Sequence, residues 1–142
     1  MRWLARSSLV LLALGCAQAP QEPTGDGLVG PLWQLVRFRG GDDRVLTPVD
    51  GSQYTLQFQA DGRVSARIDC NRGSGTWKSG GKSQIEFGPM AVTRAMCPPG
   101  SMPMHDHILK QLPHIRSYVI KNGHLFLSLM ADGGTYELEP AR

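Results

Sequence analysis

Apolar and polar residues alternate through most of the chain after Gly30, and a period of two is typical of β-strands. A first strand is predicted at residues 32–37. Two alternating runs, 54–58 and 64–70, lie on either side of the turn sequence Ala60-Asp61-Gly62-Arg63. Two such runs joined by a turn that contains glycine predict a β-hairpin with one buried face.

Three more hairpins are predicted further along the chain, each with a turn sequence between alternating runs. The turns are Gly80-Gly81-Lys82 between Trp77 and residues 85–87, Asn122-Gly123 between residues 118–120 and 125–129, and Asp132-Gly133-Gly134 before residues 136–138. Strands joined by tight turns run in opposite directions. The pattern therefore predicts an antiparallel meander.

One segment, residues 104–112, has the spacing of a helix, and it lies between Pro103 and Pro113. We expect this helix to plug or cover the sheet. The predicted fold class is mainly β: a small antiparallel β-barrel-like meander of about eight strands with one short helix, since closure of a sheet removes the edges that promote aggregation.

The first 16 residues have the layout of an export signal peptide, with Arg2 and Arg6 before the apolar run at residues 9–14. That run is far shorter than the roughly 20 residues of a transmembrane helix. It ends in Leu12-Ala13-Leu14-Gly15-Cys16, which resembles a lipobox. We therefore expect Cys16 to carry lipid and to become the mature N-terminus.

An ordinary cleavage site at Ala17-Gln18-Ala19 is the alternative, but it would place Pro20 directly after the cut, where signal peptidase cleaves poorly. Ala17 instead of Asp after Cys16 indicates, by enteric-type sorting, an outer-membrane address. The predicted location is the bacterial cell envelope, with the protein anchored by lipid in the outer membrane and facing the periplasm. The membrane is then its first partner.

Composition agrees with one folded domain behind a flexible tether. Residues 17–30 contain mostly Pro, Gly, Gln, Glu, Thr and Asp, so we assign them to a tether and residues 31–142 to the domain. The formal charge of the whole chain is +3. Two arginines but no acidic residue precede Cys16, so the rest is close to charge balance. Nucleic acid is therefore not an expected partner.

Two blocks of sequence resemble the META domain family, which includes the HslJ-like heat-shock lipoproteins. The blocks are Cys70-Asn71-Arg72-Gly73-Ser74-Gly75-Thr76-Trp77 and Phe87-Gly88-Pro89-Met90-Ala91-Val92-Thr93-Arg94-Ala95-Met96-Cys97. The resemblance implies a small antiparallel β-barrel with a helix, an envelope location, and links to heat stress and to resistance against novobiocin-type antibiotics. It implies no established enzymatic reaction.

Within these blocks, Asn71, Gly73 and Gly75 tolerate tight backbone geometry, and we expect a β-bulge or a corner there. Cys70 and Cys97 are the two thiols that remain once Cys16 is lipidated. Because an exported protein meets an oxidising compartment, a Cys70–Cys97 disulfide is expected. Two free buried thiols are the alternative.

No catalytic motif is recognised in the chain. Gly81-Lys82-Ser83 falls in a predicted hairpin turn and lacks the glycine spacing of a phosphate-binding loop. There is no Gly-x-Ser-x-Gly sequence for a nucleophilic serine, and the acidic residues are scattered. We therefore expect neither an enzyme nor a cofactor.

A copper site is the sharpest alternative, because thioether and imidazole ligands suit copper in an oxidising envelope. Its candidate ligands are Met102, Met104, His105, His107 and His114. His105 and His107 are two positions apart and would face different sides of a helix, so we expect no bound metal. A second alternative function is that of a barrel-type inhibitor of a lytic enzyme.

The predicted function is that of a non-catalytic envelope module that binds an unidentified envelope protein or small molecule. The disulfide would bring the segment after Cys70 beside the segment before Cys97, on one edge of the sheet. Guanidinium groups held on such a rigid edge are good donors for a partner's carboxylate or phosphate. The predicted binding rim consists of Asn71, Arg72, Thr93 and Arg94.

A purely structural role is the alternative for each of these residues. In that interpretation Asn71 satisfies backbone groups at a bend, and Arg72 or Arg94 pairs with Asp69 on the surface.

Overall fold

The computed structural model describes residues 27–142. The predicted signal peptide, the predicted lipidation site Cys16 and most of the predicted tether lie outside the described residues. Within the described part, no helix is long and apolar enough to span a membrane.

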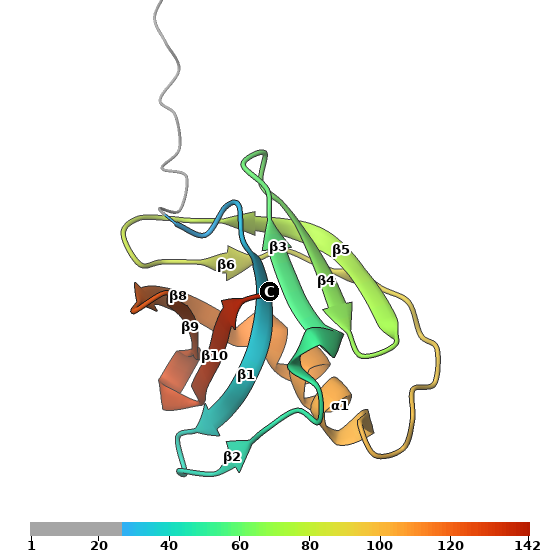
Figure 1. Cartoon of the computed structure of the whole chain (residues 1–142). Helices are drawn as coiled ribbons and strands as arrows, with labels where there is room; N and C mark the ends of the chain where they lie inside the picture. The colour runs from blue at the N-terminus through green and yellow to red at the C-terminus, as the bar shows by residue number, and fades with distance from the viewer. Residues whose placement is uncertain (1–26) are drawn as a thin grey trace, which may run out of the picture.

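Ten strands in the described part form one antiparallel sheet (Figure 1). They are β1 (Leu32–Gly40), β2 (Val45–Leu46), β3 (Tyr54–Phe58), β4 (Arg63–Ile68), β5 (Asn71–Lys78), β6 (Glu86–Phe87), β7 (Ala91–Val92), β8 (Ile115–Lys121), β9 (His124–Leu129) and β10 (Gly134–Pro140). The helices are α1 (Met102–Gln111) and the 3₁₀ turns η1 (Gly51–Gln53), η2 (Leu112–His114) and η3 (Met130–Asp132).

Eight of these strands follow one another around a nearly closed barrel, in the order β6-β5-β4-β3-β1-β10-β9-β8. The short strands β2 and β7 pair with β1 and β5 and were not predicted. The chain just before β6 closes the barrel against β8: Ile85 N–H donates to Arg116 O (3.1 Å), and Tyr118 N–H donates to Ser83 O (2.9 Å). The predicted fold class is confirmed.

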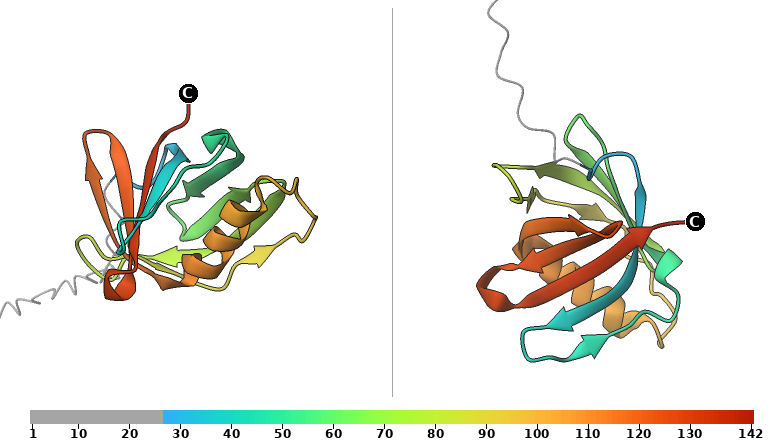
Figure 2. Two further views of the ribbon diagram at one scale, coloured as in Figure 1. Left: turned by 90° about the horizontal axis from the view of Figure 1, so that it is seen from below. Right: turned by 60° about the vertical axis from the view of Figure 1, so that its left-hand side comes forward.

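The two ends of the strand order, β6 and β8, are joined by these hydrogen bonds at one end of the barrel only. Beyond β6 the chain continues along β5 as β7, whereas β8 is preceded by α1 and η2. Helix α1 spans the open end, since His105 contacts Asn71 at the start of β5 and His107 contacts Tyr136 of β10. Figure 2 shows α1 between these two sides of the barrel.

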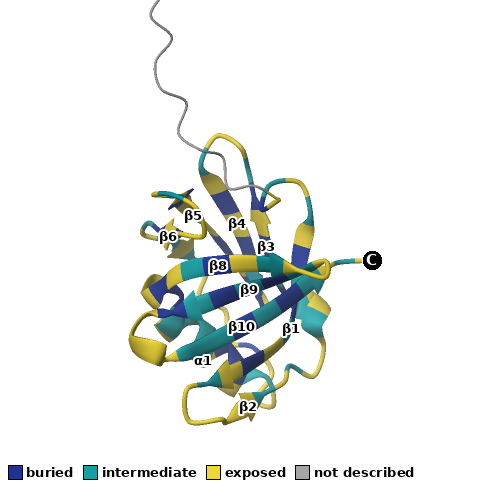
Figure 3. Ribbon diagram, turned by 90° about the vertical axis from the view of Figure 1, so that its left-hand side faces the viewer, coloured by how far each residue is buried: buried dark blue, intermediate teal, exposed yellow. Residues whose placement is uncertain are grey.

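The barrel interior is filled by side chains. Buried and more exposed positions alternate along β9 and through most of β10, as Figure 3 shows. The largest fully buried apolar side chains are Phe58, Leu28, Ile68, Ile85, Ile115, Leu125, Leu127 and Val64. Burial of this inward face is the main driving force for folding of such a sheet.

All four predicted hairpins are present with their predicted turns. The first hairpin differs from the prediction at the end of its second strand, because the alternation of buried and exposed residues ends at Ile68. Asp69 adopts a positive φ of 58° in the two-residue turn between β4 and β5. Asp69 is therefore buried and Cys70 is exposed, the reverse of the predicted pattern.

The helix begins two residues earlier than predicted, at Met102. Pro103 lies in its first turn, where the missing N–H of proline costs no intrahelical hydrogen bond. Leu112 belongs to η2 instead of the helix.

The predicted bulge or corner at Asn71, Gly73 and Gly75 is wrong. Strand β5 pairs with β4 residue by residue and without a register shift. A Cβ atom at Gly73 would lie 2.9 Å from Met90 Sδ, and one at Gly75 would lie 2.9 Å from Pro89 O. These glycines therefore let the segment before β7 approach the strand closely.

The predicted tether, which ends at residue 30, extends too far along the chain, because the folded domain already includes Leu28. Leu28 is fully buried, and its carbonyl accepts a hydrogen bond from Trp33 Nε1 (3.0 Å). Val29 forms an isolated parallel bridge with Phe58. Two aliphatic residues are enough to attach the chain here, because the barrel provides an apolar site for Leu28.

Candidate functional site

The structure brings three of the four predicted rim residues together on one exposed edge. The predicted Cys70–Cys97 disulfide is present, with an S–S distance of 2.05 Å. Beside it, Arg72 N–H donates to Thr93 Oγ1 (3.0 Å), and Thr93 N–H donates to Arg72 O (2.9 Å). Arg94 follows directly. We call Arg72, Thr93 and Arg94 the cationic rim.

Asn71, the fourth predicted rim residue, is not on the surface. It is 0% exposed, so it cannot contact a partner. Its Oδ1 accepts from Ala95 N–H (2.7 Å) and from Thr93 Oγ1 (2.9 Å). Its Nδ2 donates to Ala95 O (3.0 Å). The carboxamide thus bonds to both the N–H and the C=O of Ala95, as the backbone of a neighbouring strand would. For Asn71 the alternative of a purely structural role is therefore correct.

The same carboxamide determines which ring nitrogen of the buried His105 carries a proton. Because Oδ1 of Asn71 accepts from a backbone N–H, its Nδ2 is the atom that faces His105 Nε2 at 2.9 Å. Nε2 must then accept, which places the imidazole proton on Nδ1, next to Asp106 Oδ1 at 2.9 Å. Both ring nitrogens of His105 are therefore engaged within the fold.

The two guanidinium groups of the cationic rim remain available. Arg72 Nη1 contacts only the carbonyl of Asn71 (3.4 Å), and Arg94 has no hydrogen bond or ion pair with residues 27–142. Neither arginine pairs with Asp69, whose carboxylate accepts a hydrogen bond from Ser101 Oγ. The proposed surface pairing with Asp69 is therefore wrong.

The histidines considered for copper face different sides of α1, as the spacing predicts. The ring of His107 packs against Phe38 in a tilted arrangement with ring centroids 4.3 Å apart, and its Nδ1 lies 2.9 Å from Tyr136 Oη. Burial, and then the charges of Lys110 and Arg44, lower the pKa of His107. Among residues 27–142 no three His, Cys, Asp or Glu residues are grouped to hold a metal ion. The absence of metal stays an expectation.

The remaining candidate ligands are also apart. Met104 is buried in the core, Met102 is half-buried on the first turn of α1, and His114 is exposed on η2.

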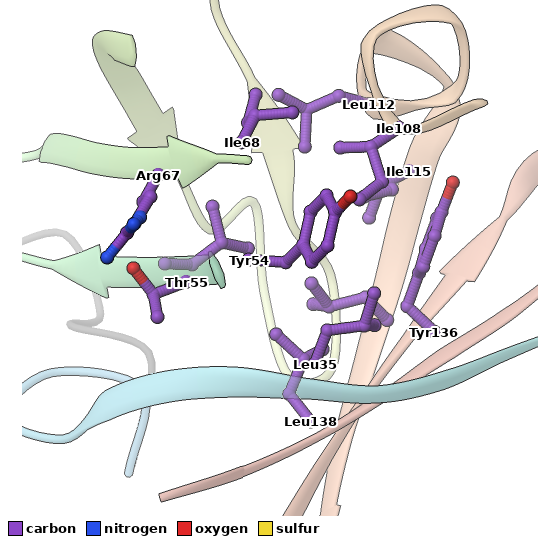
Figure 4. A pocket seen from close by; sticks show the side chains of 12 residues that line it. Leu35, Tyr54, Thr55, Arg67, Ile68, Ile108, Leu112, Ile115, Tyr136 and Leu138 are labelled. Atoms are coloured by element: carbon purple, nitrogen blue, oxygen red, sulfur yellow. The ribbon is translucent and has the colours of Figure 1, made fainter. Parts of the chain in front are cut away.

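A small apolar cavity lies between α1 and the barrel wall (Figure 4). Its volume is about 40 Å³. That space is far smaller than the several hundred Å³ of a typical small-molecule site. Tyr54 lines it and donates to Ser101 O (3.2 Å), and burial, followed by the charge of Asp69, raises its pKa to about 12. The hydroxyl of Tyr54 therefore stays protonated near neutral pH.

A larger groove of about 460 Å³ is open on the surface between α1 and the segment that carries the cationic rim. Its walls include Met90, Arg94 and Met96 on one side and Met102, Asp106 and Leu109 on the other. The groove was not predicted. Its two sides come from separate elements, and no periodicity or motif indicates that they meet.

A second open groove, of about 400 Å³, lies at the other end of α1, where His107 and Phe38 contribute to its walls. The one arginine of its lining is already paired, since Arg44 Nη2 is 2.8 Å from Asp42 Oδ2, and Asp132 adds a further carboxylate. It therefore offers no unpaired guanidinium, in contrast to the groove beside Arg94.

Comparisons with known proteins agree with this architecture. The family model described as META domain matches residues 26–142. An NMR structure of a protein from Burkholderia xenovorans has a TM-score of 0.68 and 21% identity, and the match covers 94% of this chain and 98% of that one. A crystal structure of a DUF4847 family protein from Bacteroides vulgatus has a TM-score of 0.60 and 18% identity, over 82% and 96% of the two chains. These similarities show the fold. No curated protein matches the chain.

Proposed function

The chain belongs to the META domain family, and on this premise we propose that it is a non-catalytic, lipid-anchored binding module of the bacterial envelope. One observation carries the proposal. The buried side chains of Asn71 and His105 bond to each other, Asn71 bonds also to the backbone of Ala95 and His105 to the carboxylate of Asp106, whereas Arg72 and Arg94 stand exposed on an edge that a disulfide holds. Such an arrangement suits recognition better than proton transfer.

Two further features support this location and role. A disulfide persists in oxidising compartments, such as the periplasm, and is rare in the cytosol. The resemblance to HslJ-like lipoproteins implies a link to heat stress and to novobiocin-type antibiotics. We therefore propose that the module acts in the envelope response to these stresses, anchored to the outer membrane through Cys16.

The anchor is tested by mass spectrometry of the mature protein isolated from membranes. We expect the chain to begin at Cys16 and to carry the mass of a diacylglycerol group plus an amide-linked acyl chain. In the variant Cys16→Ser this lipid mass should be absent and the protein should leave the membrane fraction. A mature wild-type chain that begins at Ala17 or later and carries no lipid would contradict the proposal.

The cationic rim is tested by complementation of a deletion strain under heat or novobiocin stress. The double variant Arg72→Glu with Arg94→Glu should fold and localise normally, because both side chains are exposed, yet it should fail to restore growth. Lys82→Glu with Lys121→Glu is the matched control, since it makes the same charge change at exposed positions elsewhere. Normal growth with a stable, localised rim variant would remove this surface from consideration.

A further inference from the structure

Residues 93–97 follow β7 and carry Thr93 and Arg94 of the cationic rim; they bond along one side to the start of β5 and leave the other side unpaired. The inward bonds of this edge alternate: Thr93 N–H donates to Arg72 O and Ala95 N–H donates to Asn71 Oδ1. In an extended chain the backbone groups of the intervening residues point the opposite way. Those residues are Arg94 and Met96, whose N–H and C=O groups have no hydrogen-bond partner among residues 27–142.

This edge is fixed in place before any partner arrives. Ala95 is fixed by both atoms of the Asn71 carboxamide, and the next residue but one, Cys97, is crosslinked to Cys70. Met96 nevertheless remains 93% exposed. A rigid and exposed edge loses little conformational entropy when a second strand pairs with it.

Helix α1 forms the opposite wall of the groove but does not satisfy the edge. The backbone groups of a helix interior bond within the helix. The groove of about 460 Å³ therefore separates unpaired strand groups from a helix surface. An unpaired backbone edge that continues a strand is the feature to which an extended peptide adds as a further strand.

The side chains of the groove indicate the chemistry of its occupant. Met90, Met96, Met102 and Leu109 form an adaptable apolar lining. The guanidinium of Arg94 is unpaired and stands on the edge itself, whereas the one carboxylate of the lining, Asp106, lies on the helix side of the groove, where it accepts a hydrogen bond from His105 Nδ1. The free charge on the edge is thus positive.

We propose that this groove binds an extended segment of another envelope protein by β-strand addition to Arg94 and Met96. The segment carries an acidic side chain opposite Arg94 and apolar side chains at alternate positions that pack on the methionines. This inference rests on the proposed function as a binding module and specifies its partner class.

A second copy of this chain fits the edge less well. Two identical edges that pair antiparallel about Arg94 would place two guanidinium groups directly opposite each other, and like charges in that position are destabilising. Arg94 thus opposes self-pairing and favours an acidic partner.

The test uses a display library of random nonapeptides, selected on the full chain purified in detergent micelles. We expect enriched peptides to alternate apolar residues with an acidic residue. Their affinities are then measured by fluorescence anisotropy on variants whose melting curves match the wild type. Arg94→Glu should weaken binding at least about tenfold, whereas the control Lys82→Glu should leave it unchanged.

The backbone hydrogen bonds are tested separately from the side chains. Met96→Pro removes the unpaired N–H, and Met96→Ala keeps it, so the proline variant should bind about tenfold more weakly than the alanine variant. Methylation of alternate peptide amides should cause a similar loss without changing the protein.

Three results would count against the inference. Enriched peptides that bind equally well to Arg94→Glu and Met96→Pro would place the binding site elsewhere and leave the module's binding role intact. A wild-type dimer that Met96→Pro dissociates would make a second copy the occupant. Failure to enrich any peptide would also count against strand addition, while failure of the proposed function itself is judged by the complementation experiment.

Discussion

Replacement of Asn71 by alanine is expected to lower the free energy of unfolding by about 3 to 4 kcal/mol. The side chain is fully buried and bonds to Ala95, Thr93 and His105. Its removal leaves these groups without a partner, and a buried polar group without a hydrogen bond costs about 1 to 3 kcal/mol. Ala95 and Thr93 are exposed, so water offsets part of the loss.

The measurement is urea unfolding of the wild type and the variant, followed by circular dichroism. Gln57→Ala is the matched control, because it removes a carboxamide from an exposed position in the same sheet and should change stability by less than about 0.5 kcal/mol. A loss below about 1 kcal/mol in Asn71→Ala would mean that the buried carboxamide does not hold the edge in place.

Reduction of the Cys70–Cys97 disulfide is expected to cost about 3.5 kcal/mol. The bond closes a loop over a sequence separation of 27, and the chain-entropy model gives about this value for such a loop. The loss adds to a local effect, since Cys97 Sγ also accepts from Cys70 N–H (3.2 Å). Reduction should therefore loosen the edge that carries Arg94 and weaken peptide binding as well.

Unfolding with and without a phosphine reductant measures this contribution. The double variant Cys70→Ala with Cys97→Ala should be insensitive to the reductant and should unfold near the midpoint of the reduced wild type. Thiol labelling under denaturing, non-reducing conditions provides the complementary test. Two labelled cysteines in freshly isolated envelope protein would show that the bond is absent in the cell.

These two predictions describe one structural unit. The carboxamide of Asn71 and the disulfide hold the two ends of the same short segment, residues 93–97. The cationic rim depends on this segment for its geometry. A variant that weakens either attachment should lose binding before it loses the fold, because the eight-stranded barrel has its own hydrophobic core.

Local sequence was sufficient to predict the strands and hairpins. In a strand with one buried face the side-chain period is two, and a tight turn places both partner strands within a few residues. The turn at Asn122-Gly123 illustrates this, because both residues have positive φ, as a two-residue hairpin of this kind requires. The disulfide was also predictable, since only two cysteines remained for the domain.

Distant contacts explain why the site was predicted only in part. Asn71 was placed on the rim with Arg72, but the two-residue turn at Asp69 and Cys70 determines which of the neighbours points inward. Its partners Ala95 and His105 are 24 and 34 residues away. The pattern of neighbouring residues does not indicate a hydrogen bond between residues so far apart in the sequence.

The sequence by itself therefore determined the strands, their turns, the crosslink and the arginines at the exposed edge, because pleat period, turn chemistry and cysteine count are properties of neighbouring residues. Only the tertiary structure decided that Asn71 is buried, that the barrel interior is filled, and that one edge stays open beside α1. Those features depend on where the barrel closes, and closure is set by the packing of segments far apart in the chain.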